Sequence, residues 1–95
     1  MTNWNQIAEF YGYQSQSNQL TEECGELIQA ISKFRRAKTE VEKAKAYSNY
    51  VEEIADVEIM LAQIKHLLGV SEQEVATIKL QKLQRTLRRI EEGVA

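Results

Sequence analysis

The absence of proline and the small number of glycines, four in 95 residues, restrict most strongly how this chain can fold. Proline and glycine supply much of the chemistry of tight turns, so the sequence offers few places for a β-hairpin. Ala, Leu, Ile, Glu, Gln and Lys dominate the composition, and these residues favour helices. We therefore expect an all-α protein with a single domain over residues 1–95, because a chain of this length supports one modest hydrophobic core.

Two capping boxes mark expected helix starts. Thr39 is followed three residues later by Glu42, and Ser71 is followed in the same way by Glu74, the pattern in which two side chains satisfy the first free backbone amides of a helix. Gly69 stands where a left-handed C-cap would end the preceding helix. The expected helices cover residues 3–11, about 15–37, 39–68 and 71 onward. Short connections between such helices predict a four-helix bundle.

Apolar residues recur at spacings of three and four in the three longer helices, as expected for helices with one buried face. In the second helix they are Leu20, Cys24, Leu27, Ile28, Ile31 and Phe34. In the third they are Tyr47, Tyr50, Ile54, Val57, Leu61, Ile64 and Leu68. In the fourth they are Ala76, Leu80, Leu83, Leu87 and Ile90.

Four acidic residues interrupt this pattern where a buried face is expected. Glu23 and Glu26 are three residues apart at the border of the second helix's stripe, and Glu53 and Asp56 repeat this spacing in the third helix. Of the eleven residues 54–64, eight are apolar, so we expect burial on much of this segment's circumference and little access of Asp56 to water. Gly25 lies between the first two acids, and it costs a helix about 1 kcal/mol relative to alanine. We expect it to leave room for a neighbouring helix or a ligand.

Buried carboxylates that face one another need neutralisation. The nearest basic residue on the same helix, Lys33, lies ten residues beyond Glu23. Oxygen ligands without histidine or cysteine select hard cations, so we expect a Mg²⁺ site, with Mn²⁺ as a substitute. A Cys/His zinc site is excluded because the chain has one cysteine, Cys24, and one histidine, His66. The alternative is that the acids are ordinary surface residues, which is the commoner situation for a single E-x-x-E.

The segments "EECGEL" and "EEIADV" resemble the E-x-x-E and E-x-x-D signature of the MazG-like all-α nucleoside triphosphate pyrophosphohydrolases, relatives of dimeric dUTPases and dCTP pyrophosphatases. The resemblance covers about residues 13–89. It implies that Glu23, Glu26, Glu53 and Asp56 are Mg²⁺ ligands. It also implies a homodimer or homotetramer with sites completed across subunits.

The segment "KLQRTLRRI" resembles the closing K-x-x-x-N-x-x-R segment of the same family. This places Lys82 and Arg89 on matching positions, whereas Thr86 stands where asparagine is usual. Lys82 and Arg89 are therefore expected contacts to substrate phosphates, and Lys33, near the end of the second helix, is a further expected contact because phosphates need positive charge as well as metal. The alternative for these basic residues is a solvated helix face or favourable charge near a helix C-terminus.

The reaction that this resemblance implies is cleavage of a nucleoside triphosphate between its α- and β-phosphates, giving a nucleoside monophosphate and pyrophosphate. A carboxylate that is not fully used in metal coordination would accept a proton from the attacking water, and Glu22 and Glu26 are the two candidates for this catalytic base. The aromatic side chains that could stack on a base, or else belong to the core or an interface, are Trp4, Phe10, Tyr11, Tyr13, Phe34 and Tyr50.

Several other functions are disfavoured or left open. A net charge of −2 does not indicate a nucleic-acid partner, and no apolar run is long enough for a membrane span, so we expect neither partner and a cytoplasmic location. A di-iron bundle would need E-x-x-H pairs, and residues 79–89 do not resemble a helix-turn-helix. The open alternative is a noncatalytic helical module in which the acidic pairs meet basic residues of another subunit.

Overall fold

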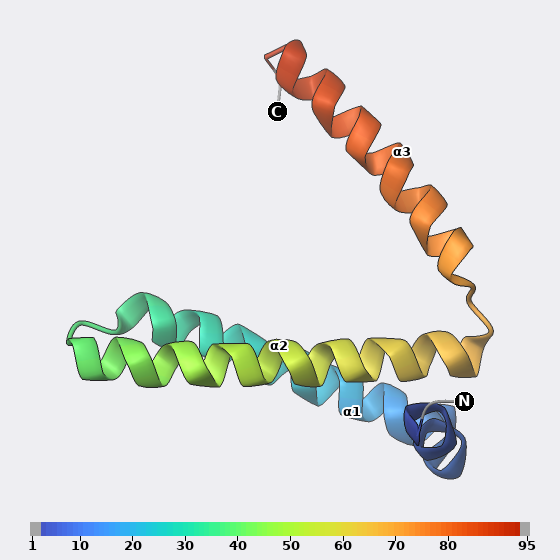
Figure 1. Ribbon diagram of the computed structural model, residues 1–95, viewed down its shortest axis with the longest axis horizontal. Coiled ribbons are helices and arrows are strands. Elements are labelled where there is room, and N and C mark those ends of the chain that lie inside the picture. Colours follow the sequence, from blue (N-terminus) through green and yellow to red (C-terminus); the bar gives the residue numbers. More distant parts are fainter. Residues whose placement is uncertain (1–2, 94–95) are drawn as a thin grey trace.

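Three helices make up residues 3–93, the part of the chain that the computed structural model describes (Figure 1): α1 (Asn3–Arg36), α2 (Glu40–Leu68) and α3 (Glu72–Glu91). These described residues contain no strand, so the all-α prediction is confirmed. The ends of the expected domain, residues 1–2 and 94–95, lie outside the described residues. None of the three helices combines the length and the low polarity needed to cross a membrane.

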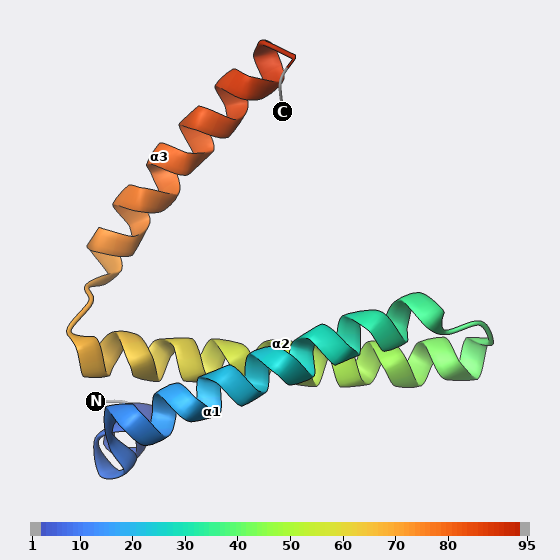
Figure 2. The ribbon, with the colours of Figure 1, turned by 180° about the vertical axis from the view of Figure 1, so that it is seen from behind.

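Gly12 breaks α1 into two arms. Its backbone has φ 84° and ψ 169°, a conformation that glycine adopts readily and other residues rarely do. The two arms correspond to the first two helices expected from the sequence, and the N-terminal arm turns away from the axis of the longer one (Figures 1 and 2). The Nε2 atom of His66 lies 2.7 Å from Oε2 of Glu9, so the N-terminal arm is linked to the end of α2.

The expected capping boxes are both confirmed. The Thr39 hydroxyl accepts a hydrogen bond from the Glu42 amide at 3.1 Å, and the Glu42 carboxylate accepts one from the Thr39 amide at 3.0 Å. Ser71 and Glu74 form the same reciprocal pair, with distances of 3.0 Å and 2.8 Å. Gly69 ends α2 in the left-handed conformation, with φ 70° and ψ 25°. These short-range signals set the ends of α2 and the start of α3.

The two long helices α1 and α2 pack against each other in antiparallel orientation (Figure 1). The buried apolar residues at their contact are mostly small: Ala8, Ala30, Ala46 and Met60. Two buried glutamines lie in the same contact, Gln16 on α1 and Gln63 on α2, which are 6% and 2% exposed. The Gln16 amide nitrogen donates a hydrogen bond of 2.7 Å to the Gln63 carbonyl oxygen. This polar pair defines one register of α1 on α2, because sliding either helix by a turn would leave both amides buried without a partner.

We expect Gln63→Leu to lower the free energy of unfolding by about 1–3 kcal/mol, because it leaves the buried Gln16 amide without its partner. In the double variant Gln16→Leu/Gln63→Leu most of this loss should be recovered, since neither buried amide remains. Urea unfolding of Gln16→Leu, Gln63→Leu, the double variant and the wild type gives the coupling energy between the two residues. Additive effects of the two substitutions would contradict the structural role of this pair.

Helix α3 stands apart from the helix pair. Within residues 3–93 it does not pack against α1 or α2, although Nζ of Lys65 in α2 lies 3.0 Å from Oε1 of Glu72 at the start of α3. It leaves the end of α2 at an oblique angle (Figures 1 and 2). The radius of gyration is accordingly 17.2 Å, whereas a compact chain of this length has about 12 Å. The expected four-helix bundle is therefore not formed within a single chain. The apolar residues of α3, each more than half exposed, are Ile78, Leu80, Leu83, Leu87 and Ile90.

The apolar stripe expected on the second helix is only partly buried. Leu20, Leu27 and Ile31 are half-buried, but Cys24, Ile28 and Phe34 are exposed, so their assignment to the core is wrong for the single chain. The reason is geometric: one partner helix covers a narrower arc than the stripe occupies. Within the part of the chain that the structure describes, no atom of α2 lies within 4 Å of a Cβ built at Gly25, so close approach of α2 does not explain this glycine.

Candidate metal centre

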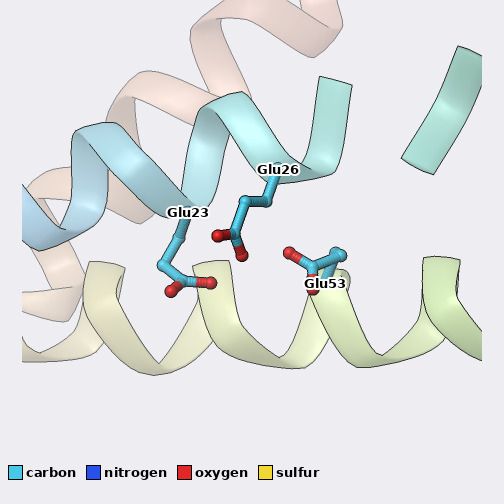
Figure 3. Close-up of side chains that lie close together, drawn as sticks. All are labelled: Glu23, Glu26 and Glu53. Atoms are coloured by element: carbon cyan, nitrogen blue, oxygen red, sulfur yellow. The ribbon is translucent and has the colours of Figure 1, made fainter. Parts of the chain in front are cut away.

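The antiparallel pairing of α1 and α2 brings the two acidic motifs together. Glu23 and Glu26 project from α1, and Glu53 projects from α2 into the same space between the helices (Figure 3). One carboxylate oxygen from each of the three lies within 4.8 Å of the others. We refer to these three residues as the acidic cluster. Side chains three residues apart on a helix share a face, so each motif presents both of its acids to the partner helix.

Asp56, the fourth expected ligand, is half-buried next to the acidic cluster. Partial burial raises the pKa of Glu23; a hydrogen bond from Gln19 opposes this, and the charges of Asp56 and Glu26 raise it further. Partial burial likewise raises the pKa of Glu53, together with the contact to Glu26 and the charges of the neighbouring acids. The folded chain therefore holds these carboxylates where their negative charge is unfavourable.

Within the described residues, the acidic cluster lacks the partners that buried carboxylates normally have. Oε2 of Glu23 and Oε2 of Glu53 are buried and accept no hydrogen bond. The other oxygen of Glu23 accepts a hydrogen bond of 2.9 Å from the Gln19 amide. The ion pairs of residues 3–93 are Lys43–Glu40 and Lys65–Glu72, and neither these nor the His66–Glu9 contact involves the cluster. Unpartnered oxygens that face one another from two helices fit a hard divalent cation, which needs several oxygen ligands and compensates their charge.

A pocket of about 180 Å³ opens beside the cluster. Glu26 and Glu53 line it together with Gln29, Lys33 and Asn49. Lys33 was expected near the substrate from the sequence, whereas Gln29 and Asn49 were not among the expected site residues. Their spacing is the signal that could have found them, since Gln29 is three residues after Glu26 and Asn49 four residues before Glu53.

The remaining expected site residues lie elsewhere. Glu22 is exposed and does not belong to the acidic cluster, so of the two candidate catalytic bases only Glu26 is part of it. Lys82 and Arg89 are exposed on α3, which does not pack against the helices that carry the cluster. A single chain therefore brings together Glu23, Glu26 and Glu53, with Asp56 and Lys33 beside them, but not the basic residues of α3.

The aromatic residues do not line the pocket beside the acidic cluster. Phe34 and Tyr50 pack edge to face, with ring centroids 5.7 Å apart, and line a different pocket of about 300 Å³ with Tyr47, Val51 and Ile54. The N-terminal aromatic residues are largely exposed in the single chain: Trp4, Phe10, Tyr11 and Tyr13. Stacking of any of them on a base stays a prediction.

We expect the metal-free protein to become more stable as the pH is lowered from 7 toward 5. The pKa values of Glu23 and Glu53 are higher in the folded protein than in the unfolded chain. Their contribution to stability is therefore fully present when the pH is below the pKa of the unfolded chain, and it is lost as the pH rises through the pKa of the folded protein. The capping residues Glu42 and Glu74 have lowered pKa values, and the stability that they contribute is lost only at more acidic pH. Urea unfolding in EDTA at pH 5, 6 and 7 measures the trend.

The control for this experiment is the double variant Glu23→Gln/Glu53→Gln, in which the two groups no longer titrate. The pH trend of the wild type should be steeper than that of the double variant. Mg²⁺ should stabilise the wild type at pH 7 and less at pH 5, because protons compete with the cation for the same oxygens. Equal pH trends for the two proteins would contradict the assignment.

Comparison of the chain with protein-family models, with curated proteins and with solved structures found no match. The arrangement offers up to four carboxylates for a divalent cation and, at the edge of the same pocket, one lysine for an anion. A cation site next to a positive side chain is suited to a substrate that carries phosphate groups.

Proposed function

We propose that the chain is a Mg²⁺-dependent nucleoside triphosphate pyrophosphohydrolase, which cleaves an NTP or dNTP between the α- and β-phosphates to give a nucleoside monophosphate and pyrophosphate. The observation that carries the proposal is the acidic cluster with two buried oxygens, one on Glu23 and one on Glu53, that have no hydrogen-bond partner. Its resemblance to the paired motifs of the MazG-like enzymes supports the same reaction. Mn²⁺ is expected to substitute for Mg²⁺.

In this proposal Glu23, Glu26, Glu53 and Asp56 hold the cation between α1 and α2. Mg²⁺ bound there would neutralise charge on the phosphates and make water more acidic. A bond forms between the water oxygen and the α-phosphorus while the bond from that phosphorus to the bridging oxygen breaks, and its electron pair leaves with pyrophosphate. Glu26 accepts the proton of the water, because it is the more exposed of the clustered acids and borders the pocket. Lys33, at the same pocket, contacts the phosphates.

We further propose that the protein works as a homodimer or homotetramer. The single chain exposes 7515 Å², whereas a compact monomer of its 10.9 kDa mass exposes about 5,600 Å². The excess of roughly 1,900 Å² is of the size that permanent subunit interfaces cover. Exposed apolar side chains lie on α3 and also on α2, where Tyr47, Val51, Ile54 and Leu61 are exposed. Burying these faces in an assembly would complete a helical bundle from more than one chain.

A noncatalytic helical module is the second candidate, and the unpartnered apolar face of α3 is the observation that favours it. The two candidates differ in their dependence on metal. The enzyme should gain thermal stability in millimolar Mg²⁺ and release pyrophosphate from at least one nucleotide, whereas the module should do neither.

The test is a screen for pyrophosphate release from canonical and modified nucleoside and deoxynucleoside triphosphates, with Mg²⁺ or Mn²⁺ and with EDTA as the control. The proposal predicts release that depends on the metal and on the base or sugar. Absence of release from every nucleotide, in a protein that remains helical, would contradict it.

A further inference from the structure

A second pocket lies between the end of α1 and the start of α2, next to the pocket of the acidic cluster. It has a volume of about 410 Å³, and the charged residues that line it are Lys33, Arg36, Glu42 and Lys45. Lys33 and Asn49 line both pockets. The two pockets are therefore neighbouring parts of one surface, negative beside Glu26 and Glu53 and positive toward the α1–α2 turn.

The positive charge of this second pocket is not neutralised by the protein itself. No ion pair among residues 3–93 involves Lys33, Arg36 or Lys45. The carboxylate of Glu42 is engaged in capping α2, where Oε1 accepts hydrogen bonds of 3.0 Å from the amides of Lys38 and Thr39. The lowered pKa of Glu42 follows from these bonds, so its charge is compensated by the backbone. Three cationic side chains are left available to an anion.

The helix dipole explains only part of this arrangement. Lys33 and Arg36 lie at the C-terminal end of α1, where positive charge is favourable without any ligand. Lys45, however, lies in the second turn of α2, near a helix N-terminus, which favours anions. Its presence opposite the other two basic residues is thus better explained by a shared anionic ligand.

The basic residues of the second pocket lie beyond the acidic cluster along both helices. Lys33 lies seven residues after Glu26 on α1, about 10 Å along the axis, and Lys45 lies eight residues before Glu53 on α2, about 12 Å. Because α1 and α2 are antiparallel, both basic residues lie on the same side of the acidic cluster. Their long side chains can reach back part of this distance.

We propose that the second pocket binds the terminal phosphates of the nucleoside triphosphate, the part that leaves as pyrophosphate. This inference rests on the proposed function and fixes the direction of the substrate: the terminal phosphate lies at the α1–α2 turn, between Arg36 and Lys45, and the α-phosphate lies at the acidic cluster. Lys33, which borders both pockets, contacts the β-phosphate, which lies between the α-phosphate at the cluster and the terminal phosphate at the turn. Arg36 and Lys45 are specificity residues for a triphosphate over a monophosphate.

The experiment is titration calorimetry of the full chain with inorganic tripolyphosphate, pyrophosphate and orthophosphate, in Mg²⁺ and in EDTA. We expect Arg36→Gln and Lys45→Gln each to weaken tripolyphosphate binding about tenfold, the effect of losing one charge-assisted contact, and to change orthophosphate binding much less. The matched control is Lys43→Gln, which removes the same charge from an α2 residue that does not line the pocket. Lys45→Arg should retain binding. Circular dichroism checks that every variant remains helical.

Tripolyphosphate binding that is equal in wild type, Arg36→Gln and Lys45→Gln would overturn the inference. For any nucleotide that is hydrolysed, KM should rise in both variants while kcat changes little, and an unchanged KM would overturn the inference but leave the proposed function standing. If no nucleotide is hydrolysed and the two variants still lose tripolyphosphate binding, the proposed hydrolysis is wrong while the polyphosphate pocket is supported.

Discussion

Replacing Glu53 with glutamine is expected to reduce Mg²⁺-dependent pyrophosphate release at least about 100-fold, because it removes one anionic ligand from the acidic cluster. The same substitution should stabilise the metal-free protein. Burial and the neighbouring carboxylates raise the pKa of Glu53, so a neutral side chain relieves an unfavourable charge. The variant should therefore be inactive in Mg²⁺ but more resistant to heat in EDTA, a combination that simple unfolding does not produce.

Glu52→Gln is the matched control, since Glu52 is the adjacent residue, is exposed and does not belong to the cluster. It should retain turnover and its response to Mg²⁺. Pyrophosphate release and thermal unfolding of the two variants, each with Mg²⁺ and with EDTA, make the comparison. Similar turnover in wild type and Glu53→Gln would show that Glu53 does not hold a required cation.

Replacing Leu83 with glutamate is expected to break the assembly. Leu83 is more than half exposed on the apolar face of α3 and makes no contact with α1 or α2, so the substitution removes nothing from the single chain. In an assembly that buries this face, loss of the leucine from both partners costs about 3 kcal/mol or more, which corresponds to at least about 100-fold weaker association. Sedimentation velocity at micromolar concentration should detect a dimer or tetramer for the wild type and a monomer for the variant.

Gln81→Glu makes the same charge change on the opposite side of α3 and should leave the assembly intact. Helical content of both variants by circular dichroism separates loss of association from loss of the helix. A wild-type protein that sediments as a monomer, or a Leu83→Glu variant that associates as the wild type does, would contradict the proposed interface.

The helix ends of the single chain were largely predictable from the sequence, because the signals are local. The capping boxes at Thr39 and Ser71 and the left-handed Gly69 involve residues within four positions of one another. The position of α3 was not predictable in this way. An amphipathic stripe predicts that a helix will bury one face, but not whether the partner belongs to the same chain or to another one.

The acidic cluster was predictable because two short motifs with the same spacing meet when the helices pair in antiparallel order. Glu23, Glu26 and Glu53 lie together for this reason. The residues that support the pair were not predictable. Gln16 and Gln63 resemble solvated polar residues in the sequence, and only the packing of α1 on α2 shows that they are buried and hydrogen-bonded to each other. Similarly, Lys45 is proposed to contact phosphate only because the α1–α2 turn places it in the same pocket as Arg36.

The most direct test of the central claim is the identity of the phosphorus products. Phosphorus NMR can follow the hydrolysis of a nucleoside triphosphate in Mg²⁺, once with the wild-type protein and once with the Glu53→Gln variant. The products that it detects show which phosphoanhydride bond is cleaved. We predict nucleoside monophosphate and pyrophosphate in equal amounts from the wild type, and neither from the variant at comparable times. Nucleoside diphosphate and orthophosphate, or the same products at the same rate from the Glu53→Gln variant, would contradict the assignment of the acidic cluster as the centre of a pyrophosphohydrolase.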